Sequence, residues 1–421
     1  MTKFQAVRGT RDILPPSVDE FVKLESTART MARLWGFEEI RTPTFEEAGL
    51  FSRGVGENTD IVEKEMYVFT DRGGRQLALR PEGTACAVRA YLENNLSQKE
   101  NSRRLFYIAN MFRAERPQAG RYREFEQIGF EIFADPSPAA DAELITLALA
   151  ILNEYGLKNP ALAINSIGCP NCRGPYRRAL KEALDKIAGE LCEDCQKRLD
   201  KNPLRCLDCK TCGPKAQAAA PAFALCAQCA AHESTVESLL RSNDVSFKKD
   251  RSIVRGLDYY TRTVFEISAA QLGAQNAVAG GGRYDGLVEL LGGTPTPASG
   301  FALGVDRVIE AKTAGQAVDS ARGRQAVFAV MVKPSSATLD YAFGIIHDLR
   351  KQGIAVFTPG YTDSMKSQMR QAGRSGAELA LIVGDEECQN QRVVIKELGS
   401  GQQETVIRAQ LSAHLKNRLN S

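Results

Sequence analysis

MFRAERPQAGRYREFEQIGFE, residues 111–131, predicts a β-hairpin whose two strands present charged and amide side chains to a pocket. Successive side chains of a strand point to opposite faces, so Ile128, Phe130 and Ile132 share one face and suit a hydrophobic core. The other face carries an aromatic ring, an amide, a residue without a side chain and a carboxylate: Phe125, Gln127, Gly129 and Glu131. This face predicts the floor of a site for a polar ligand. A solvated hairpin with a charged face is the alternative that the segment leaves open.

Arginine and glutamate crowd the turn of this hairpin. Arg113 and Glu115 close the first strand, and Arg116, Arg121 and Arg123 follow in the turn. Guanidinium groups pair with phosphate oxygens and stack on aromatic rings. The turn therefore favours a ligand that carries phosphate.

Several common phosphate and acid–base motifs are missing from the sequence. There is no G-x-x-x-x-G-K-[ST] loop, and the glycine-rich stretch at 280–286 lacks the dinucleotide-binding spacing and predicts a tight turn. The three histidines, His232, His347 and His414, lie outside the pocket segments, which argues against histidine acid–base chemistry there. A pocket of Arg, Glu, Gln and Tyr suits phosphoryl or nucleotidyl transfer driven by proximity and electrostatics.

Composition indicates an ordinary globular protein of two or three domains. The chain has 421 residues, of which 43% are hydrophobic and 25% charged, and its net charge of +3 does not by itself indicate a nucleic-acid binder. No apolar run approaches the length of a membrane span, and the N-terminus lacks the apolar core of a signal peptide. We expect a cytoplasmic protein without a membrane partner.

The periodicity of apolar residues changes along the chain and predicts an α+β protein. Residues 37–47 predict a strand with Pro43 at an edge or bulge, and residues 84–92 and 141–155 predict helices. A polar stretch rich in Ala and Gly at 311–325 predicts a linker. Beyond it, strands alternate with helices and the end is helical, which predicts a separate small α/β domain over 326–421.

Nine of the eleven cysteines lie between residues 169 and 229. They include four C-x-x-C units: Cys169 and Cys172, Cys192 and Cys195, Cys209 and Cys212, Cys226 and Cys229. A closed zinc site takes four thiolates, commonly from two such units, so eight ligands predict a metal site with room for up to two zinc ions, and the sequence leaves the number of ions and the pairing of the cysteines open. Cys206 also forms C-x-x-C with Cys209, or serves as a small buried apolar residue. Free thiols in a reduced helical insertion are the alternative.

Three segments resemble the motifs of class II aminoacyl-tRNA synthetases. GFEEIRTPTFE at 36–46 resembles motif 1, the dimer-forming strand; FRAE at 112–115 with RYREF at 121–125 resembles motif 2; and GVDR at 304–307 resembles motif 3. RGLDYY at 255–260 and GGRYD at 281–285 resemble the two signature peptides of histidyl-tRNA synthetases, and LRPEGT at 79–84 is similar to the same family. The resemblance covers essentially the whole chain.

This resemblance implies a fold and a reaction. The fold would be an antiparallel catalytic sheet built from residues 1–168 and 233–325, a helical cysteine-rich insertion at 169–232 and an anticodon-binding α/β domain at 326–421, in a homodimer. The reaction would be that of a histidine–tRNA ligase, in which ATP and L-histidine form histidyl-adenylate and pyrophosphate, and histidine then passes to the 3′ end of tRNA(His). Mg²⁺ would bridge the phosphates of ATP, and any zinc would be structural.

The resemblance also implies the residues that bind histidine. Glu82, Thr84 and Gln127 would hold its α-ammonium group. Glu131 and Tyr260 would bracket the imidazole nitrogens, so that apolar analogues leave buried polar groups unpaired. Three further residues would complete the pocket: Gly83, Tyr259 and Tyr284. We infer from strand alternation that Gly129 leaves room for the ligand.

The remaining implied roles concern ATP and tRNA. Arg113 and Arg255 would be the catalytic pair that flanks the α-phosphate during in-line displacement. Phe125 would stack on adenine, and Arg307 would lie over its other face or bind the γ-phosphate. Glu115 and Arg121 would help to place the nucleotide. The residues expected to meet the tRNA acceptor end are Gln118 and Arg123.

Alternatives remain for the residues and for the whole chain. Glu131 could be a structural ion-pair partner of Arg113, and Tyr259 and Tyr260 could be ordinary strand aromatics. A regulatory relative that senses histidine in its biosynthesis would typically lack the anticodon-type domain and the motif arginines, which are present here. A zinc-dependent nucleic-acid binder would leave the pocket unexplained.

Overall fold

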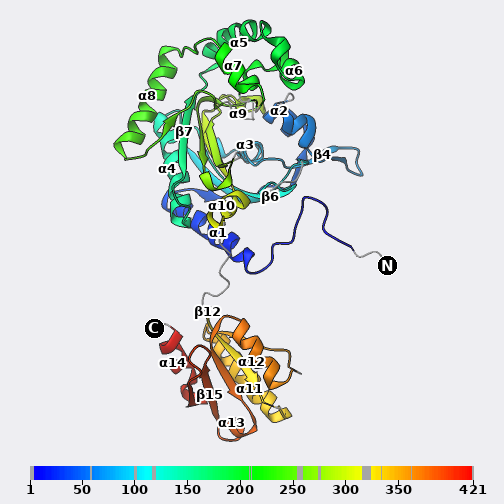
Figure 1. Cartoon of the computed structure of the whole chain (residues 1–421), viewed down its shortest axis with the longest axis vertical. Helices are drawn as coiled ribbons and strands as arrows, with labels where there is room; N and C mark the ends of the chain where they lie inside the picture. Colours follow the sequence, from blue (N-terminus) through cyan, green and yellow to red (C-terminus); the bar gives the residue numbers. More distant parts are fainter. Residues whose placement is uncertain are drawn as a thin grey trace. The chain divides into compact units, whose positions relative to one another are not determined.

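The computed structural model divides the chain into two compact units, Met1–Ala317 and Val318–Ser421 (Figure 1). The residues that the structure describes are 4–56, 59–98, 102–115, 120–207, 209, 211–253, 259–273, 276–314, 324–332, 334–361 and 363–419. No helix within these ranges is long and apolar enough to cross a membrane.

An eight-stranded sheet forms the centre of the first unit (Figure 1). Its strands are, in spatial order, β1 (Glu38–Glu39), β5 (Arg103–Phe112), β6 (Glu124–Phe133), β11 (Ala298–Gly304), β10 (Ala277–Arg283), β9 (Thr261–Ser268), β7 (Ala161–Ser166) and β8 (Lys248–Lys249). All neighbours from β5 to β7 are antiparallel, and β1 and β8 pair in parallel at the two edges. The predicted hairpin is β5–β6, and the predicted antiparallel sheet is confirmed.

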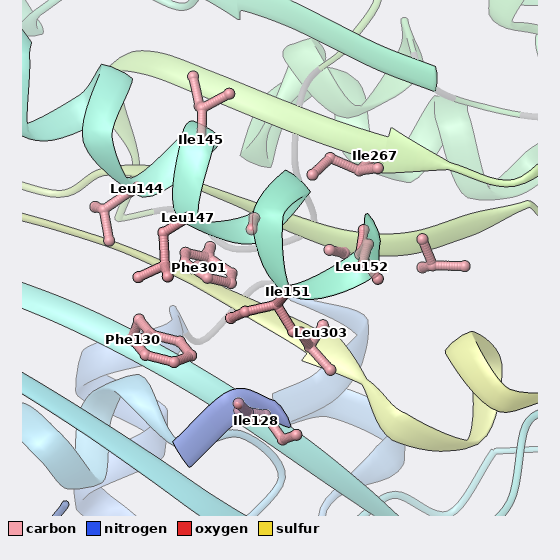
Figure 2. Packing of buried hydrophobic residues seen from close by; sticks show 14 of the residues in the cluster. Ile128, Phe130, Leu144, Ile145, Leu147, Ile151, Leu152, Ile267, Phe301 and Leu303 are labelled. Atoms are coloured by element: carbon pink, nitrogen blue, oxygen red, sulfur yellow. The ribbon is translucent and has the colours of Figure 1, made fainter. Parts of the chain in front are cut away.

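One face of this sheet is buried beneath helices. The covering helices are α1 (Ser17–Leu34), α4 (Pro138–Tyr155), α8 (Ala227–Ser242) and α10 (Val305–Thr313). Figure 2 shows Ile128 and Phe130 of β6 pointing into the layer between the sheet and α4. The Phe130 ring stacks on Phe106 and Phe301 at centroid distances of 5.4 and 5.1 Å. Burial of each such side chain contributes about 1.5–3 kcal/mol to folding. The predicted alternation in β6 is confirmed, and it directs the other face of this strand toward the site.

The opposite face carries α3 (Thr84–Glu93) and α9 (Leu287–Leu290). Helix α2 (Ala48–Val55) and a second, three-stranded sheet lie next to them. The strands of this sheet are, in spatial order, β2 (Phe45–Glu47), β4 (Gln76–Leu79) and β3 (Val68–Thr70). The single strand predicted over 37–47 is wrong, because β1 and β2 belong to different sheets. Between them, the carbonyls of Thr42 and Pro43 accept hydrogen bonds from Arg80 Nη1 at 2.8 and 3.2 Å instead of joining a ladder.

The tight turn predicted at 280–286 is also wrong for its first part, which lies in β10. A Cβ atom on Gly281 would lie 2.2 Å from the carbonyl oxygen of Gly300 on β11. The glycine is therefore needed for close approach of two strands, a role that a strand glycine often has.

The cysteine-rich segment folds into short helices: α5 (Pro170–Asp185), α6 (Glu193–Lys201) and α7 (Gly213–Ala219). They lie together at one end of the first unit, and α8 returns alongside α4 (Figure 1). They share a small apolar cluster that includes Leu180, Leu184 and Cys206.

The second unit is a five-stranded sheet with helices. Its strands are, in spatial order, β13 (Ala355–Phe357), β12 (Arg324–Met331), β14 (Ala377–Val383), β15 (Arg392–Glu397) and β16 (Gln403–Ile407). Its helices are α11 (Ser336–Lys351), α12 (Met365–Arg374), α13 (Asp385–Gln389) and α14 (Arg408–Leu419). Because β12 pairs in parallel with β13 and β14, the predicted small α/β domain is confirmed. Strand β16 was not predicted; it pairs with β15 just before the predicted terminal helix.

Candidate active site

Glu131 of β6 lies at the centre of a buried cage of hydroxyl groups that other elements supply. Its side chain is 0% exposed and accepts hydrogen bonds from Tyr284 Oη at 2.5 Å, Thr84 Oγ1 at 2.8 Å and Tyr107 Oη at 3.3 Å. In the part of the chain that the structure describes, Glu131 forms no ion pair. The alternative in which Glu131 pairs with Arg113 is therefore wrong, and a buried carboxyl group without a cation points to a ligand.

Burial raises the pKa of Glu131 to about 8, and the hydroxyl donors only partly oppose this shift. Desolvation dominates because the charged form loses its hydration in a low-dielectric site. At pH 7 most of this carboxyl group is therefore protonated. It is able to give a hydrogen bond to an imidazole nitrogen or to accept one from it.

This shift links stability to pH. The folded-state pKa of about 8 lies above the ordinary value of 4.5, so the folded state binds more protons between these values. The stabilising contribution of Glu131 is full below pH 4.5 and is lost as the pH rises through 8. We expect the free energy of unfolding of the parent chain, relative to Glu131→Gln, to fall by a few kcal/mol between about pH 5 and about pH 9. Urea unfolding at both pH values checks this, and parallel pH profiles would contradict it.

Tyr107 is a site residue that the sequence did not reveal. It lies on β5 directly opposite Gly129 on β6, and its ring fills the space above that glycine. A Cβ atom on Gly129 or on Gly83 would lie 2.2 Å from Tyr107 Cζ, and one on Gly300 would lie 1.7 Å from Glu131 Oε2. The prediction that Gly129 leaves room for the ligand is therefore wrong, because the room is taken by Tyr107. Only the strand register, not the spacing of residues, identifies this pair.

Replacing Gly129 with alanine is expected to displace the Tyr107 ring from Glu131. Overpacking of this kind typically costs about 1–3 kcal/mol of folding free energy. We expect a lower urea midpoint for Gly129→Ala and weaker histidine binding by calorimetry.

Gly49→Ala is the matched control, since a Cβ atom there meets nothing within 4 Å and the residue lies in α2. It should change stability by less than about 1 kcal/mol. Equal behaviour of the two variants would contradict the close packing of Tyr107.

Two further groups beside the cage suit a bound ammonium group. Glu82 accepts hydrogen bonds from the backbone N–H groups of Thr84 and Ala85, each at 2.8 Å, at the start of α3. Burial raises the pKa of Glu82, which a cationic ligand would reverse. Gln127 Oε1 is buried and has no hydrogen-bond partner among the described residues. A buried acceptor of this kind is costly unless a donor arrives with the ligand.

Three tyrosines complete the wall of the cage. Tyr259 contacts Tyr260 at a centroid distance of 4.8 Å and Tyr284 at 5.5 Å, and all three are buried. Tyr259 and Tyr260 precede β9 rather than lying in it, so they are not ordinary strand aromatics. The backbone carbonyl of Tyr260 accepts a hydrogen bond from Arg173 Nη1 at 2.8 Å.

Phe125 and three arginines lie at the turn end of the β5–β6 hairpin. The Arg113 guanidinium lies 5.3 Å from the Phe125 ring centroid, and its Nε donates to the Pro81 carbonyl at 2.8 Å. Arg121 donates to Glu115 at 3.1 Å, and Arg123 Nε reaches the Glu115 carbonyl at 3.5 Å. An aromatic face and guanidinium groups together can bind a nucleotide.

The junction of β11 and α10 brings Arg307 to the same end. Gly304 is the N-cap of α10, as predicted for a strand–helix junction. Burial, and next the neighbouring Arg121, lower the pKa of Arg307, so two guanidinium groups lie close together here. Asp306 holds the junction through Arg11 at 2.6 Å and the backbone N–H of Glu126 at 3.1 Å.

Two predicted site residues, Arg255 and Gln118, lie outside the described residues, as does Arg116 of the turn. The other residues predicted to bind histidine or nucleotide lie at the cage or at the turn end of the hairpin.

The eight paired cysteines form two clusters. We name Cys169, Cys172, Cys226 and Cys229 the basal cluster, and Cys192, Cys195, Cys209 and Cys212 the distal cluster; the sulfurs of each lie within 4.8 Å of one another. Four thiolates 2.3 Å from a tetrahedral zinc ion would be about 3.8 Å apart. The recorded separations are 3.7 and 4.0 Å in the basal cluster and 3.8 Å in the distal one, far beyond a disulfide bond.

Backbone N–H groups also point at these sulfurs. Cys226 N donates to Cys172 Sγ at 3.1 Å, and Cys192 N donates to Cys212 Sγ at 2.9 Å. Such bonds stabilise thiolates rather than thiols. Cys206 Sγ instead faces the Cys195 carbonyl at 3.6 Å inside the apolar cluster, outside both ligand sets. The donor set in each cluster fits a zinc ion.

A cavity of about 760 Å³ lies between the insertion and the sheet. Its wall includes Pro170, Arg173, Tyr176, Phe223, Arg251 and Tyr260. Its wall contains Tyr260 of the cage, and also Pro170 and Arg173, which follow Cys169 and Cys172 in the chain.

Comparison with known proteins connects this geometry to a family. The histidyl-tRNA synthetase family model matches residues 9–308, and the anticodon binding domain model matches residues 325–418. Curated histidine–tRNA ligases of Elusimicrobium minutum and Pelotomaculum thermopropionicum are 48% and 46% identical to this chain, covering 96% and 95% of it and 97% and 94% of their own lengths.

The crystal structure of apo S. aureus histidyl-tRNA synthetase agrees with a TM-score of 0.81 at 32% identity, covering 98% of this chain and 100% of that one. The predicted α+β fold, a class II synthetase core with a C-terminal α/β domain, is confirmed by this agreement. The chain belongs to the histidyl-tRNA synthetase family.

Proposed function

We propose that this protein is a histidine–tRNA ligase. It activates L-histidine with ATP to histidyl-adenylate and pyrophosphate, and then transfers histidine to the 3′ end of tRNA(His). The observation that carries the proposal is the Glu131 cage, in which no described residue supplies a cation, next to the Phe125 ring with Arg113 over it. The cage offers partners to both nitrogens of an imidazole, and the arginines offer charge to a triphosphate.

In the histidine pocket, Glu131 and the tyrosine wall bind the imidazole ring. Glu82 and Gln127 accept hydrogen bonds from the α-ammonium group, since one is a buried carboxylate and the other a buried acceptor without a partner among the described residues. Thr84 bridges both parts, because its backbone N–H bonds to Glu82 and its hydroxyl bonds to Glu131. Gly83 acts indirectly, by leaving space for Tyr107.

The carboxylate of histidine attacks the α-phosphorus of ATP, and pyrophosphate leaves. Arg113, and Arg255 from its signature peptide, neutralise the charge that develops on the α-phosphate oxygens. Phe125 stacks on adenine, while Arg307 and Arg121 bind the outer phosphates or the far face of the ring. Glu115 keeps Arg121 in place through its 3.1 Å ion pair. Mg²⁺, when bound with ATP, would offset the phosphate charge and would take mainly phosphate and water oxygens as ligands.

For tRNA, we assign Gln118 and Arg123 of the hairpin turn to the acceptor end and residues 326–421 to the anticodon. Residues 169–232 are an insertion domain between the core segments 1–168 and 233–325. The match of residues 325–418 to the anticodon binding domain model supports this division.

The protein acts in the cytoplasm as a homodimer. Large apolar side chains that remain exposed are concentrated in the first 70 residues, among them Val22, Leu34, Phe45 and Phe69. Exposed apolar surface of this kind favours a subunit interface.

Aminoacylation tests the proposal. The purified full-length chain should attach labelled histidine, and no other amino acid, to tRNA(His). A protein that binds histidine without charging tRNA would instead be the regulatory relative, and one that binds RNA without ATP-dependent chemistry would be a nucleic-acid binder.

A further inference from the structure

The basal cysteine cluster closes the base of the insertion. Cys169 lies at the start of α5, shortly after β7, and Cys226 lies directly before α8, which returns to the core. These two residues are 57 positions apart. A metal ion bound here would therefore tie the entry of the insertion to its exit, and such a closure removes much of the freedom of a long loop.

The same cluster is connected to the first residues of β9. The backbone N–H of Ile167 donates to the Arg262 carbonyl at 2.8 Å, and the Arg262 N–H donates to the Gly168 carbonyl at 2.9 Å. Gly168 packs so closely that a Cβ atom there would lie 2.7 Å from Cys172 Cβ. The main chain that carries the cysteine ligands thus continues the β7–β9 pairing.

Arg173 carries the connection into the histidine pocket. It follows Cys172 on α5 and donates from Nη1 to the Tyr260 carbonyl at 2.8 Å. Tyr260 contacts Tyr259, Tyr259 contacts Tyr284, and Tyr284 donates to Glu131. The orientation of α5 therefore affects the wall of the Glu131 cage. The cavity of about 760 Å³ lies on this same boundary, with Arg173 and Tyr260 both in its wall.

The distal cluster has a different setting. It joins the start of α6 to the segment before α7, and its two buried cysteines pack against Leu180 and Leu191 inside the insertion. Two recorded ion pairs connect this part of the insertion to the core: Asp60 lies 2.9 Å from Arg198 of α6 and 3.5 Å from Arg205. Partly exposed pairs of this kind contribute little.

We infer that the two clusters bind zinc for different purposes. The basal zinc is a clasp that fixes α5 against the core and, through Arg173, sets the position of Tyr260 for histidine. The distal zinc stabilises only the insertion. The histidine readout of this inference rests on the proposed function, whereas zinc content and backbone protection do not.

Zinc content and histidine activation together test the clasp in the full-length chain. Inductively coupled plasma mass spectrometry should find two zinc ions per chain in the parent, one for each four-cysteine cluster. It should find one zinc ion per chain in each of two double variants. The basal variant is Cys169→Ser with Cys226→Ser, and the matched distal control is Cys192→Ser with Cys209→Ser. In histidine-dependent ATP–pyrophosphate exchange, the basal variant should raise the KM for histidine about tenfold and the distal variant less than about twofold.

Arg173→Met tests whether the basal cluster acts on Tyr260 through Arg173, even if the basal variant does not fold. It should keep two zinc ions per chain and still raise the KM for histidine roughly three- to tenfold, the effect of losing one hydrogen bond to a backbone carbonyl. An unchanged KM with two zinc ions bound would overturn the route through Arg173.

Amide hydrogen exchange separates failure of this inference from failure of the proposed function. Exchange at the start of β9 (Thr261–Ser268) should accelerate in the basal and Arg173→Met variants and not in the distal variant. If the variants show this pattern while the parent has no histidine-dependent pyrophosphate exchange, the proposed function would be wrong and the clasp would stand. A parent without zinc, or equal effects of both cysteine pairs, would overturn the clasp.

Discussion

Arg113→Ala is expected to lower the rate of histidine-dependent ATP–pyrophosphate exchange by about 10²–10³-fold, the usual effect of removing one preorganised donor from a developing anion. Arg113 lies over Phe125 and is fixed by the Pro81 carbonyl at 2.8 Å, so its guanidinium is directed before ATP binds. Because it lies outside the Glu131 cage, the KM for histidine should change little. Steady-state exchange at varied histidine and ATP concentrations measures both quantities.

Arg75→Ala is the control for this variant, because Arg75 has a 70% exposed side chain and pairs only with Asp71 in the recorded ion pairs. It should leave exchange unchanged. A loss in Arg113→Ala that appears only in the KM for histidine would assign Arg113 to amino-acid binding and would contradict its role at the α-phosphate.

Glu131→Ala is expected to lower kcat/KM for histidine by on the order of 10³-fold or more. A site built to hydrogen-bond its ligand loses strongly when a buried partner is removed, and here Tyr284, Tyr107 and Thr84 would also lose their shared acceptor. Binding of ATP alone should persist, since the arginines around Phe125 are unchanged. Pyrophosphate exchange and equilibrium binding of ATP check the two parts.

Glu93→Ala is the matched carboxylate control, with a side chain that is 67% exposed and paired with Arg89 on α3. Circular dichroism should show that both variants remain folded. Near-normal exchange in a folded Glu131→Ala protein would contradict the assignment of the histidine pocket.

The β5–β6 hairpin shows which features of the site could be predicted from the sequence alone. Alternation alone placed Phe130 in the core and Glu131 on the site face, because a period of two residues is a local property of a strand. One hydrogen-bond partner of Glu131, Tyr107, could not be predicted in this way. Tyr107 meets it only through the register of β5 against β6, which pairs Tyr107 with Gly129, and register depends on the turn and on neighbouring strands.

Two other differences have the same origin in long-range contacts. The predicted strand over 37–47 divides because buried Arg80, far along the chain, takes the carbonyls of Thr42 and Pro43. The four C-x-x-C units predicted metal but not their partners, which the fold determines by returning α8 to the base of α5. The histidine signature peptides, by contrast, led directly to residues that the structure describes at the cage, Tyr259, Tyr260 and Tyr284.

The most direct test is histidine-dependent ATP–pyrophosphate exchange on the purified full-length chain, with the other amino acids as controls. We expect exchange with L-histidine alone, since in the proposed pocket the imidazole would meet the Glu131 cage while the ammonium group would reach Glu82 and Gln127. Exchange with several amino acids, or none at all from a protein that still binds histidine, would contradict the proposed activation of histidine at this site.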